Sequence, residues 1–467
     1  MKHKSFSTPT NSLHLQEGCS ERGQTKKVWE IFLWLIFLML LGISVFIFLP
    51  VFDDPDILMK SSWQWYCLFG TLAFTVGYFL FLLFSALFVR CWGTVFTDDT
   101  LPVCTVLVPA YNEGSHVYDT ISSLLASDYP AEKLRITAIN DGSADDTLYY
   151  LNKAKTLSPQ ITVIDLKKNQ GKKHALYLGI KQSAGDIIVT VDSDTIVRKD
   201  TLRQIVQPFL LENVGAVAGS ITGKDNDRNW HVRVLDVMLV FGCEFLRKAQ
   251  SASGNVFCTP GALSAYRRSV IIPLIDQWLD QRFWGKPARI GEDRAIATLI
   301  LCSGFQIVHQ PLAMAETNLP RTYYGACKML IRWTRSDIRE NIIMSRFVLK
   351  QMKFFSLRSL SLFVHWFALF VNMLLPFVFI PVGIFCLATG DHIIFQLSFI
   401  YVSAALWSLI PAIIFIRQKK SLLHTIWAFV FGLYNLLALS WIIVYSVFTL
   451  HNSNWLTREL KRNTKCS

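Results

Sequence analysis

The residues Asp186-Ile-Ile-Val-Thr-Val-Asp-Ser-Asp194 decide the fold of the central part of this chain. The apolar and β-branched run 187–191 is typical of a buried strand, and two carboxylates follow where it ends. Ligands of open α/β sheets bind beyond the carboxyl ends of strands. Asp192 and Asp194 can share a divalent cation there, which in turn neutralises a diphosphate. An aspartate-rich turn is the alternative for these two residues taken alone.

Similar apolar runs that end in polar residues precede this strand. They are Val103–Val108, Leu134–Ile139 and Ile161–Ile164. Helical stretches separate the runs, at Gly114–Ala126, Asp145–Lys155 and Lys173–Ser183. This alternation predicts a parallel α/β sheet with helices on both faces. Asn112-Glu113 and Asp141-Gly142-Ser143 follow two of the runs, so several carboxylates should gather at one edge of the sheet.

The composition of the whole chain indicates a membrane protein with a soluble part. Its 467 residues are 52% hydrophobic and only 17% charged, with a mean hydropathy of +0.35. This excludes a disordered chain, a coiled coil, a collagen and a disulfide mini-protein. The net charge of +12 suits anionic lipids and small anionic ligands as well as nucleic acid, so charge alone does not choose.

Several familiar motifs are missing from the sequence. The ten cysteines form no Cys-x-x-Cys pair and no zinc-like spacing with histidine, and are typical of a reducing compartment. There is no Gly-x-Gly-x-x-Gly fingerprint, no Gly-Lys-Ser/Thr phosphate loop and no Gly-x-Ser-x-Gly elbow. These absences count against a dinucleotide dehydrogenase, a P-loop ATPase and an α/β-hydrolase.

Two uncharged segments near the start of the chain, Ile31–Phe52 and Trp63–Val89, each exceed the roughly 20 residues that cross a bilayer. The loop between them is acidic, whereas Lys26-Lys27 precede the first segment and Arg90 follows the second. The positive-inside rule then places the N-terminus in the cytoplasm and returns the chain there at Arg90.

Apolar runs return at Leu360–Thr389, Ile393–Ile416 and Thr425–Leu450. A basic loop at 417–420 marks the cytoplasmic side, and a strict count of spans then places the tail outside. That tail, residues 451–467, is itself basic. One C-terminal segment could therefore be re-entrant or interfacial, and the sequence predicts five or six spans in total.

Two loops of the central region have residues suited to a nucleotide. Asp141 ends a predicted strand and could hydrogen-bond a base or ribose, or simply form a turn before a helix. The basic loop Gly171-Lys172-Lys173-His174 precedes a helix, where lysine is electrostatically disfavoured. A phosphate partner would explain the lysines, and a solvated basic turn is the alternative.

Two later motifs have the residues that a group transfer needs. Gly291-Glu292-Asp293-Arg294 opens a predicted helix, where carboxylates also suit the helix dipole. Asp293 could instead be a general base that deprotonates an acceptor hydroxyl. Arg332 can grip a diphosphate and Trp333 offers a flat face to a sugar ring, although an amphipathic interfacial helix would have the same composition.

Seven motifs in this order resemble those of family-2 inverting glycosyltransferases, and especially the hyaluronan and chitin-oligosaccharide synthases among the membrane-embedded processive enzymes. They are Val108–Glu113, Asn140–Ser143, Asn169–His174, Asp192–Asp194, Cys258–Arg268, Gly291–Arg294 and Arg332–Ser336. The resemblance implies a Rossmann-like α/β catalytic domain of the GT-A type in the cytoplasm, between N- and C-terminal transmembrane helices of the cell membrane.

The resemblance also implies a UDP-sugar donor, UDP-GlcNAc with UDP-GlcA as a further possibility, and Mg²⁺ or Mn²⁺ as cofactor. The other implied partners are a glycan acceptor and the lipid bilayer, and nucleic acid is not among them. The implied residues that bind the nucleotide sugar are Pro109, Tyr111, Glu113, Asp141, Lys172, Asp192 and Arg332. Asp192 and Asp194 would hold the metal, Asp293 with Glu292 would be catalytic, and Cys258, Arg268 and Trp333 would bind the acceptor.

The expected boundaries follow these features. They are a cytoplasmic segment at 1–30, two spans at 31–92, the GT-A domain at 97–320, interfacial helices at 321–353, C-terminal spans at 358–450 and a tail at 451–467.

One departure from the family pattern puts the product in question. The processivity motif Gln-Gln-x-Arg-Trp is here Met329-Leu330-Ile331-Arg332-Trp333, so both amide positions are apolar. A processive synthase that exports its glycan, a single transfer to a lipid-linked acceptor and a catalytically silent binding module are therefore the three hypotheses. The intact acidic motifs count against the silent module.

Overall fold

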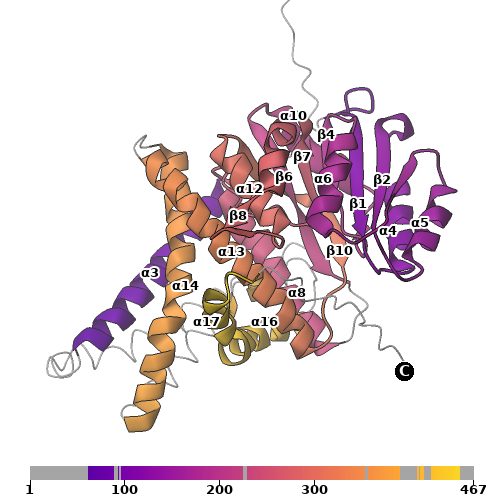
Figure 1. Cartoon of the computed structure of the whole chain (residues 1–467). Coiled ribbons are helices and arrows are strands. Elements are labelled where there is room, and N and C mark those ends of the chain that lie inside the picture. Colours follow the sequence, from indigo (N-terminus) through magenta and orange to yellow (C-terminus); the bar gives the residue numbers. More distant parts are fainter. Residues whose placement is uncertain are drawn as a thin grey trace, which may run out of the picture.

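The computed structural model describes residues 62–88, 93, 96–224, 229–352, 356–389, 408–409, 411–414 and 422–452. Its centre is an eight-stranded sheet in the order β3-β2-β1-β4-β7-β6-β10-β5 (Figure 1). The strands are β1 Cys104–Ala110, β2 Leu134–Asp141, β3 Ile161–Leu166, β4 Ile187–Thr190, β5 Ile196–Val197, β6 Val214–Gly223, β7 Ser264–Arg267 and β10 Gln306–Thr317. A separate hairpin joins β8, Arg282–Phe283, to β9, Lys286–Pro287.

The first half of the sheet is parallel, as the sequence predicts. β1 pairs in parallel with β2 and with β4, and β2 pairs in parallel with β3. Consecutive strands of this half are joined through helices, which is the connection that parallel pairing requires. The polar residues that follow β1, β2 and β4 therefore lie at one edge of the sheet.

The second half is mixed, so the prediction of a parallel sheet is wrong there. β7 runs antiparallel to both β4 and β6, and β5 runs antiparallel to β10. Ser264, the first residue of β7, pairs with Thr190, the last residue of β4. A strand that begins at the edge where its neighbour ends must run back along it. The sequence stretch that enters β7, Cys258–Leu263, consequently lies at the same edge as the end of β4.

Helices cover both faces of the sheet because its central strands are apolar on both sides. Along β1, Val106 and Val108 pack in a core with helices α4 and α5, whereas Leu107 packs in a second core with α6 and α12. All three side chains are fully buried, and each such burial contributes about 1.5–3 kcal/mol. These helices are α4 His116–Leu125, α5 Thr147–Lys155, α6 Lys172–Gln182 and α12 Glu292–Cys302.

The remaining helices around the sheet are short, except α8 and α13. They are α7 Thr201–Val206, α8 Trp230–Phe241, the π-helical turn η3 Gly242–Arg247, α9 Lys248–Ser251, α10 Arg268–Ile271, α11 Ile275–Leu279 and α13 Tyr323–Gln351. Single 3-10 turns η1, η2 and η4 lie at Ala131–Lys133, Gln207–Leu210 and Ile272–Leu274. Because α13 packs on α12, α14 and α17, it joins the part of the chain that contains the sheet to the apolar helices.

Apolar helices lie beside the part of the chain that contains the sheet, and the two longest of them project away from it (Figure 1). They are α3 Ser62–Leu87, α14 Leu357–Thr389, α16 Leu422–Tyr434, the π-helical turn η6 Asn435–Leu439 and α17 Trp441–Phe448. Among the described residues, Leu357–Phe377 is long and apolar enough to cross a membrane, and the pair Ile426–Leu439 and Trp441–Phe448, bent by 42°, qualifies if it is one span. The predicted span Ile31–Phe52 and most of Ile393–Ile416 lie outside the described residues.

Candidate active site

Loops that follow β1, β2 and β4 are joined by hydrogen bonds at one edge of the sheet. The Asn112 backbone N–H donates to Ser143 Oγ over 3.0 Å, and Ser193 Oγ donates to Glu113 Oε1 over 2.9 Å. The Glu113 backbone N–H donates to Thr147 Oγ1 over 2.8 Å. Motifs that lie far apart in the sequence thus share one surface, as the strand-end argument predicts.

The Asp141 carboxylate shapes the loop that leads into α6. It is 2% exposed and accepts the backbone N–H groups of Gln170 and Gly171, each over 2.8 Å. Burial raises the pKa of Asp141, and the two hydrogen bonds offset this rise only in part. Pro109 is buried within β1 and Tyr111 is partly buried just after it, on the neighbouring strand end.

Lys172, the first residue of α6, lies between two carboxylates. Its Nζ is 2.6 Å from Asp192 Oδ1 and 3.0 Å from Glu292 Oε1. Burial alone would lower the pKa of Lys172, but the two carboxylates outweigh it and raise the pKa well above its usual range. A side chain at Gly261 would collide with this cation, because an added Cβ would lie 2.5 Å from Lys172 Nζ. The structure therefore brings together residues from β4, α6, α12 and the loop before β7.

Glu292 and Asp293 are neighbours in sequence, but their environments differ. Burial raises the pKa of Glu292, yet Lys172 and then Arg332 outweigh it and hold the pKa below its usual range. Burial and the charge of Glu292 raise the pKa of Asp293 to about 6. Asp293 Oδ1 accepts the backbone N–H of Arg294 over 2.8 Å. Asp293 is therefore the carboxylate whose proton affinity suits a general base near neutral pH.

Asp192 and Asp194 supply oxygen ligands of the kind that Mg²⁺ and Mn²⁺ take. Asp194 Oδ1 accepts the hydroxyl of Thr317 over 3.4 Å, and Asp192 pairs with Lys172. In the described part of the chain, no group of three or more His, Cys, Asp and Glu side chains could hold a metal ion. A metal ion that is also bound by substrate phosphates does not need three protein ligands. Asp192 and Asp194 therefore fit a metal ion bound together with a diphosphate.

Helix α13 carries the predicted grip on the diphosphate. Arg332 acts electrostatically on both Glu292 and Asp293, so it faces the same site. Met329 is 6% exposed and packs in an apolar cluster with residues of α8, and Trp333 packs against that cluster. The apolar residue at this amide position is therefore part of a small core.

Of the three residues predicted to bind the acceptor, the structure brings Cys258 to the site and keeps Arg268 away. Cys258 Sγ lies 3.9 Å from Asp293 Oδ2. Arg268 instead donates through Nε to Ser183 O at the far end of α6 from Lys172. Its backbone N–H donates to Asp186, before the first residue of β4. The acceptor role predicted for Arg268 is therefore not supported, because β7 carries the chain from Cys258 to the opposite edge.

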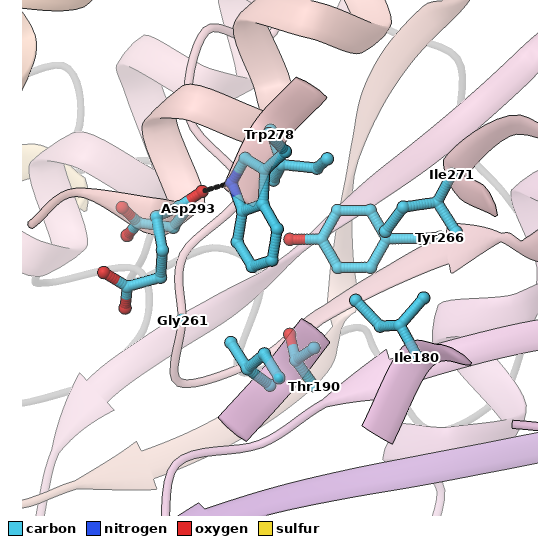
Figure 2. Close-up of a pocket in the computed structure, with 10 residues that line it drawn as sticks. Ile180, Thr190, Gly261, Tyr266, Ile271, Trp278 and Asp293 are labelled. Atoms are coloured by element: carbon cyan, nitrogen blue, oxygen red, sulfur yellow. Dashed lines mark hydrogen bonds between the residues drawn. The ribbon is translucent and has the colours of Figure 1, made fainter. Parts of the chain in front are cut away.

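Two further residues near Asp293 escaped the sequence argument. Trp278 Nε1 donates to Glu292 O over 2.9 Å, and Trp278 lines a largely apolar pocket behind Asp293 (Figure 2). Arg247 ends the π-helical turn, and although burial lowers its pKa, the Cys243, Cys258 and Asp293 side chains raise it. No sequence motif marks either residue. The π-helical turn that ends at Arg247 is a feature often found at functional sites, but only the structure reveals it.

Comparison with known proteins relates this site to a family. The model of "Glycosyl transferase family 2" matches residues 105–274. An N-acetylglucosaminyltransferase of Mesorhizobium japonicum is 30% identical over 376 residues, which cover 79% of this chain and 85% of that protein. An N-acetylglucosaminyltransferase of Azorhizobium caulinodans is 34% identical over 254 residues, which cover 53% of this chain and 64% of that protein.

A solved structure has the same fold. The mannosyltransferase of Pyrobaculum calidifontis, in complex with GDP-Man and Mn²⁺, superposes with a TM-score of 0.51 at 19% identity. The match covers 78% of this chain and 97% of that one. The eight-stranded mixed sheet of this chain, covered by helices on both faces, thus has the GT-A fold.

Proposed function

Because this chain belongs to glycosyl transferase family 2 and is a glycosyltransferase, we propose that it transfers N-acetylglucosamine from UDP-GlcNAc to a hydroxyl of a growing glycan. The donor follows from the name of the Mesorhizobium japonicum relative, whose length the match covers to 85%. The resemblance to hyaluronan and chitin-oligosaccharide synthases supports the same donor. UDP-GlcA would be a second donor if the product were hyaluronan.

One observation carries the proposal: the half-buried cation of Lys172 joins Asp192, of the Asp192-Ser193-Asp194 motif, to Glu292, the carboxylate beside the base. Lys172 binds both Asp192 and Glu292, so the donor-side acids and Asp293 form one cluster. Since Glu292 is committed to Lys172, Asp293 is the carboxylate left to take a proton. A cluster of this kind suits a reaction in which negative charge builds on a leaving diphosphate while a neighbouring hydroxyl loses its proton.

The reaction then follows from the positions of these groups. Asp293 removes the proton of the acceptor hydroxyl as its oxygen attacks the anomeric carbon. A new C–O bond forms on the face opposite UDP, the bond from the sugar to UDP breaks, and the configuration inverts. Lys172 and Arg332 offset the charge that UDP carries away. Asp192 and Asp194 would hold Mg²⁺ or Mn²⁺, which supplies further positive charge to the diphosphate when bound.

The same chain would export its product. α3 and α14 pack on each other below the catalytic part, where Tyr78 OH and His365 Nδ1 lie 3.2 Å apart. We propose the domain boundaries of the sequence analysis, with residues 97–320 as the cytoplasmic catalytic domain of a multi-pass protein of the cell membrane. The growing glycan would leave between the flanking helices.

A single transfer to a lipid-linked acceptor is the second candidate, and the packing of Met329 favours it. This side chain is buried against α8 and offers no hydrogen bond to an acceptor sugar. A processive enzyme must hold its product between transfers, so the loss of this polar contact weakens the grip on the chain.

Membranes that contain the protein, supplied with radiolabelled UDP-GlcNAc and Mn²⁺, distinguish the candidates. A ladder or polymer supports the processive synthase, and one product that extracts into organic solvent supports the lipid-linked acceptor. Release of UDP from other UDP-sugars but not from UDP-GlcNAc would refute the donor. Absence of UDP release from every UDP-sugar would refute the function itself.

A further inference from the structure

The segment that leads into Asp293 is held by three side chains, each from a different helix. Lys173 Nζ donates to Ala288 O over 3.0 Å, and Arg339 Nη2 donates to Ile290 O over 2.5 Å. Trp278 Nε1 donates to Glu292 O over 2.9 Å (Figure 2). Alternate carbonyl groups of residues 288–292 are thus fixed. We call Lys173, Trp278 and Arg339 the carbonyl clamp.

Two of the three clamp donors, Lys173 and Arg339, belong to helices that also carry the groups proposed to face the donor sugar. Lys173 follows Lys172 at the start of α6. Arg339 lies two turns beyond Arg332 on α13, so both project from the same side of that helix. The backbone before Asp293 is therefore tied to the two helices that would grip the diphosphate.

The segment that the clamp holds lies next to an exposed loop. It directly follows the β8–β9 hairpin, where Trp284 is 71% exposed and Lys286–Pro287 are exposed. The clamp separates Asp293 from that exposed loop.

Lys173 is an unexpected residue for a purely structural position. It is 7% exposed, and its ammonium group faces the Ala288 carbonyl and lies 5.4 Å from the centre of the Trp278 ring. Burial and then Arg339 lower the pKa of Lys173 to about 8. A buried charge that meets a carbonyl and an aromatic ring is costly compared with an apolar side chain of equal length. That cost needs an explanation other than stability.

The backbone of this segment packs so closely on α13 that one position accepts no side chain. Gly291 has φ +72°, and an added Cβ would lie 1.7 Å from Ser336 Oγ of α13. Arg339 in turn bonds the buried Glu340 through Nε over 3.1 Å, and Gln281 Nε2 donates to Glu340 over 3.0 Å. Helix α13 therefore sets the position of the backbone that carries Asp293.

We propose that Lys173, Trp278 and Arg339 are positioning residues that hold the Asp293 carboxylate in register with Lys172 and Arg332. The proposal rests on the proposed function, in which Asp293 is the base. A displacement of about 1 Å of a catalytic group can cost roughly 100-fold in rate. The clamp acts on the rate of transfer and leaves the binding of UDP to Lys172 and Arg332 unchanged.

Lys173→Met and Trp278→Phe in the full-length protein test this. The first removes the ammonium group at nearly constant length, and the second removes the indole N–H but keeps an aromatic ring. Each should lower kcat for UDP release at least about 10-fold, with the Kd for UDP within about 3-fold of wild type. Lys173→Arg, which keeps a donor, should recover part of kcat. Lys181→Met is the matched control, because Lys181 pairs across the same α6–α11 contact with Asp276 but touches no carbonyl of residues 288–292.

The outcomes separate this proposal from the proposed function. If wild type turns over UDP-GlcNAc and Asp293→Asn does not, while both clamp variants match wild type, the clamp proposal alone is refuted. A loss of kcat that is accompanied by an equal loss of UDP affinity, or by a fall in melting temperature that Lys173→Arg does not repair, also refutes it. A wild type that turns over no UDP-sugar refutes both.

Discussion

The donor side and the acceptor side of the site differ in how their charges are balanced. On the donor side, Lys172 already binds Asp192 and Glu292, so the acids and the cation are paired before any ligand arrives. On the acceptor side, Asp293 is half-buried beside the Cys258 thiol and its pKa is raised to about 6. A paired cation can exchange its carboxylate partners for the oxygens of an anionic ligand. A carboxylate with raised proton affinity suits proton transfer. Under the proposed function, the donor side would therefore bind the ligand and the acceptor side would carry out the proton transfer.

Asp293→Asn, on the acceptor side, should have the largest effect of the variants. The amide cannot take a proton, so kcat for UDP release should fall at least about 1,000-fold, while UDP affinity stays close to wild type. UDP release and calorimetric binding of UDP measure the two quantities. Asp119→Asn, at an exposed position of α4, is the control and should change neither. Wild-type turnover by Asp293→Asn would show that the base is elsewhere.

Lys172→Met should impair the donor side, where UDP is proposed to bind. Loss of this cation should weaken UDP binding about 10- to 100-fold, as expected when charge-assisted hydrogen bonds are lost. It also removes the ion-pair partner of the buried Glu292 and leaves only the weaker effect of Arg332, so the protein should lose stability, by up to about 3–5 kcal/mol.

The double variant Lys172→Met/Glu292→Gln removes both charges, so it should regain stability in thermal melts but not UDP affinity. The adjacent Lys173→Met is the matched comparison and should leave UDP affinity unchanged. Equal effects of the two lysine variants on UDP affinity would contradict the division into two sides.

The pH dependence of kcat/KM should report the Asp293 carboxylate. Its pKa of about 6 lies above the usual aspartate value, so the basic form is lost as pH falls through 6. The rate at pH 5 should be about tenfold below the plateau. Glu292→Gln removes a negative charge that raises the pKa of Asp293, so the acidic limb should move to lower pH. An acidic limb near pH 4 in wild type would contradict the assignment.

Cys258→Ala should have the smallest effect. Burial and then the Asp293 charge raise the pKa of the Cys258 thiol, so little thiolate forms at neutral pH. We expect kcat within about fivefold of wild type and slow alkylation of Cys258 by iodoacetamide at pH 7.5, followed by mass spectrometry. Rapid alkylation with parallel loss of activity would mean that the thiol is activated and takes part in the acceptor side.

The strand–helix alternation and the strand-end carboxylates could be predicted because they depend on contacts that are close in sequence. The strands β1, β2, β3 and β4 coincide with apolar runs that predict buried strands. Asp141 and Asp192 come directly after two of these apolar runs or within two residues of them. The reversal of β7 could not be predicted in this way. Its direction depends on the edge at which the loop Cys258–Leu263 enters the sheet, which no local pattern records.

What the sequence by itself determined is the order of the elements and the chemical types at the site: acids after strands, lysines at the start of α6, and an Arg-Trp pair on α13. The sequence proposed Asp293 as the base, and only the tertiary structure supplies a physical difference between Asp293 and its neighbour Glu292. Glu292 and Asp293 are adjacent in one motif, but Glu292 pairs with Lys172, whereas burial and the charge of Glu292 raise the pKa of Asp293 to about 6. The physical reason is that proton affinity depends on burial and on the charges nearby, and both are set by helices that come together only in the folded chain.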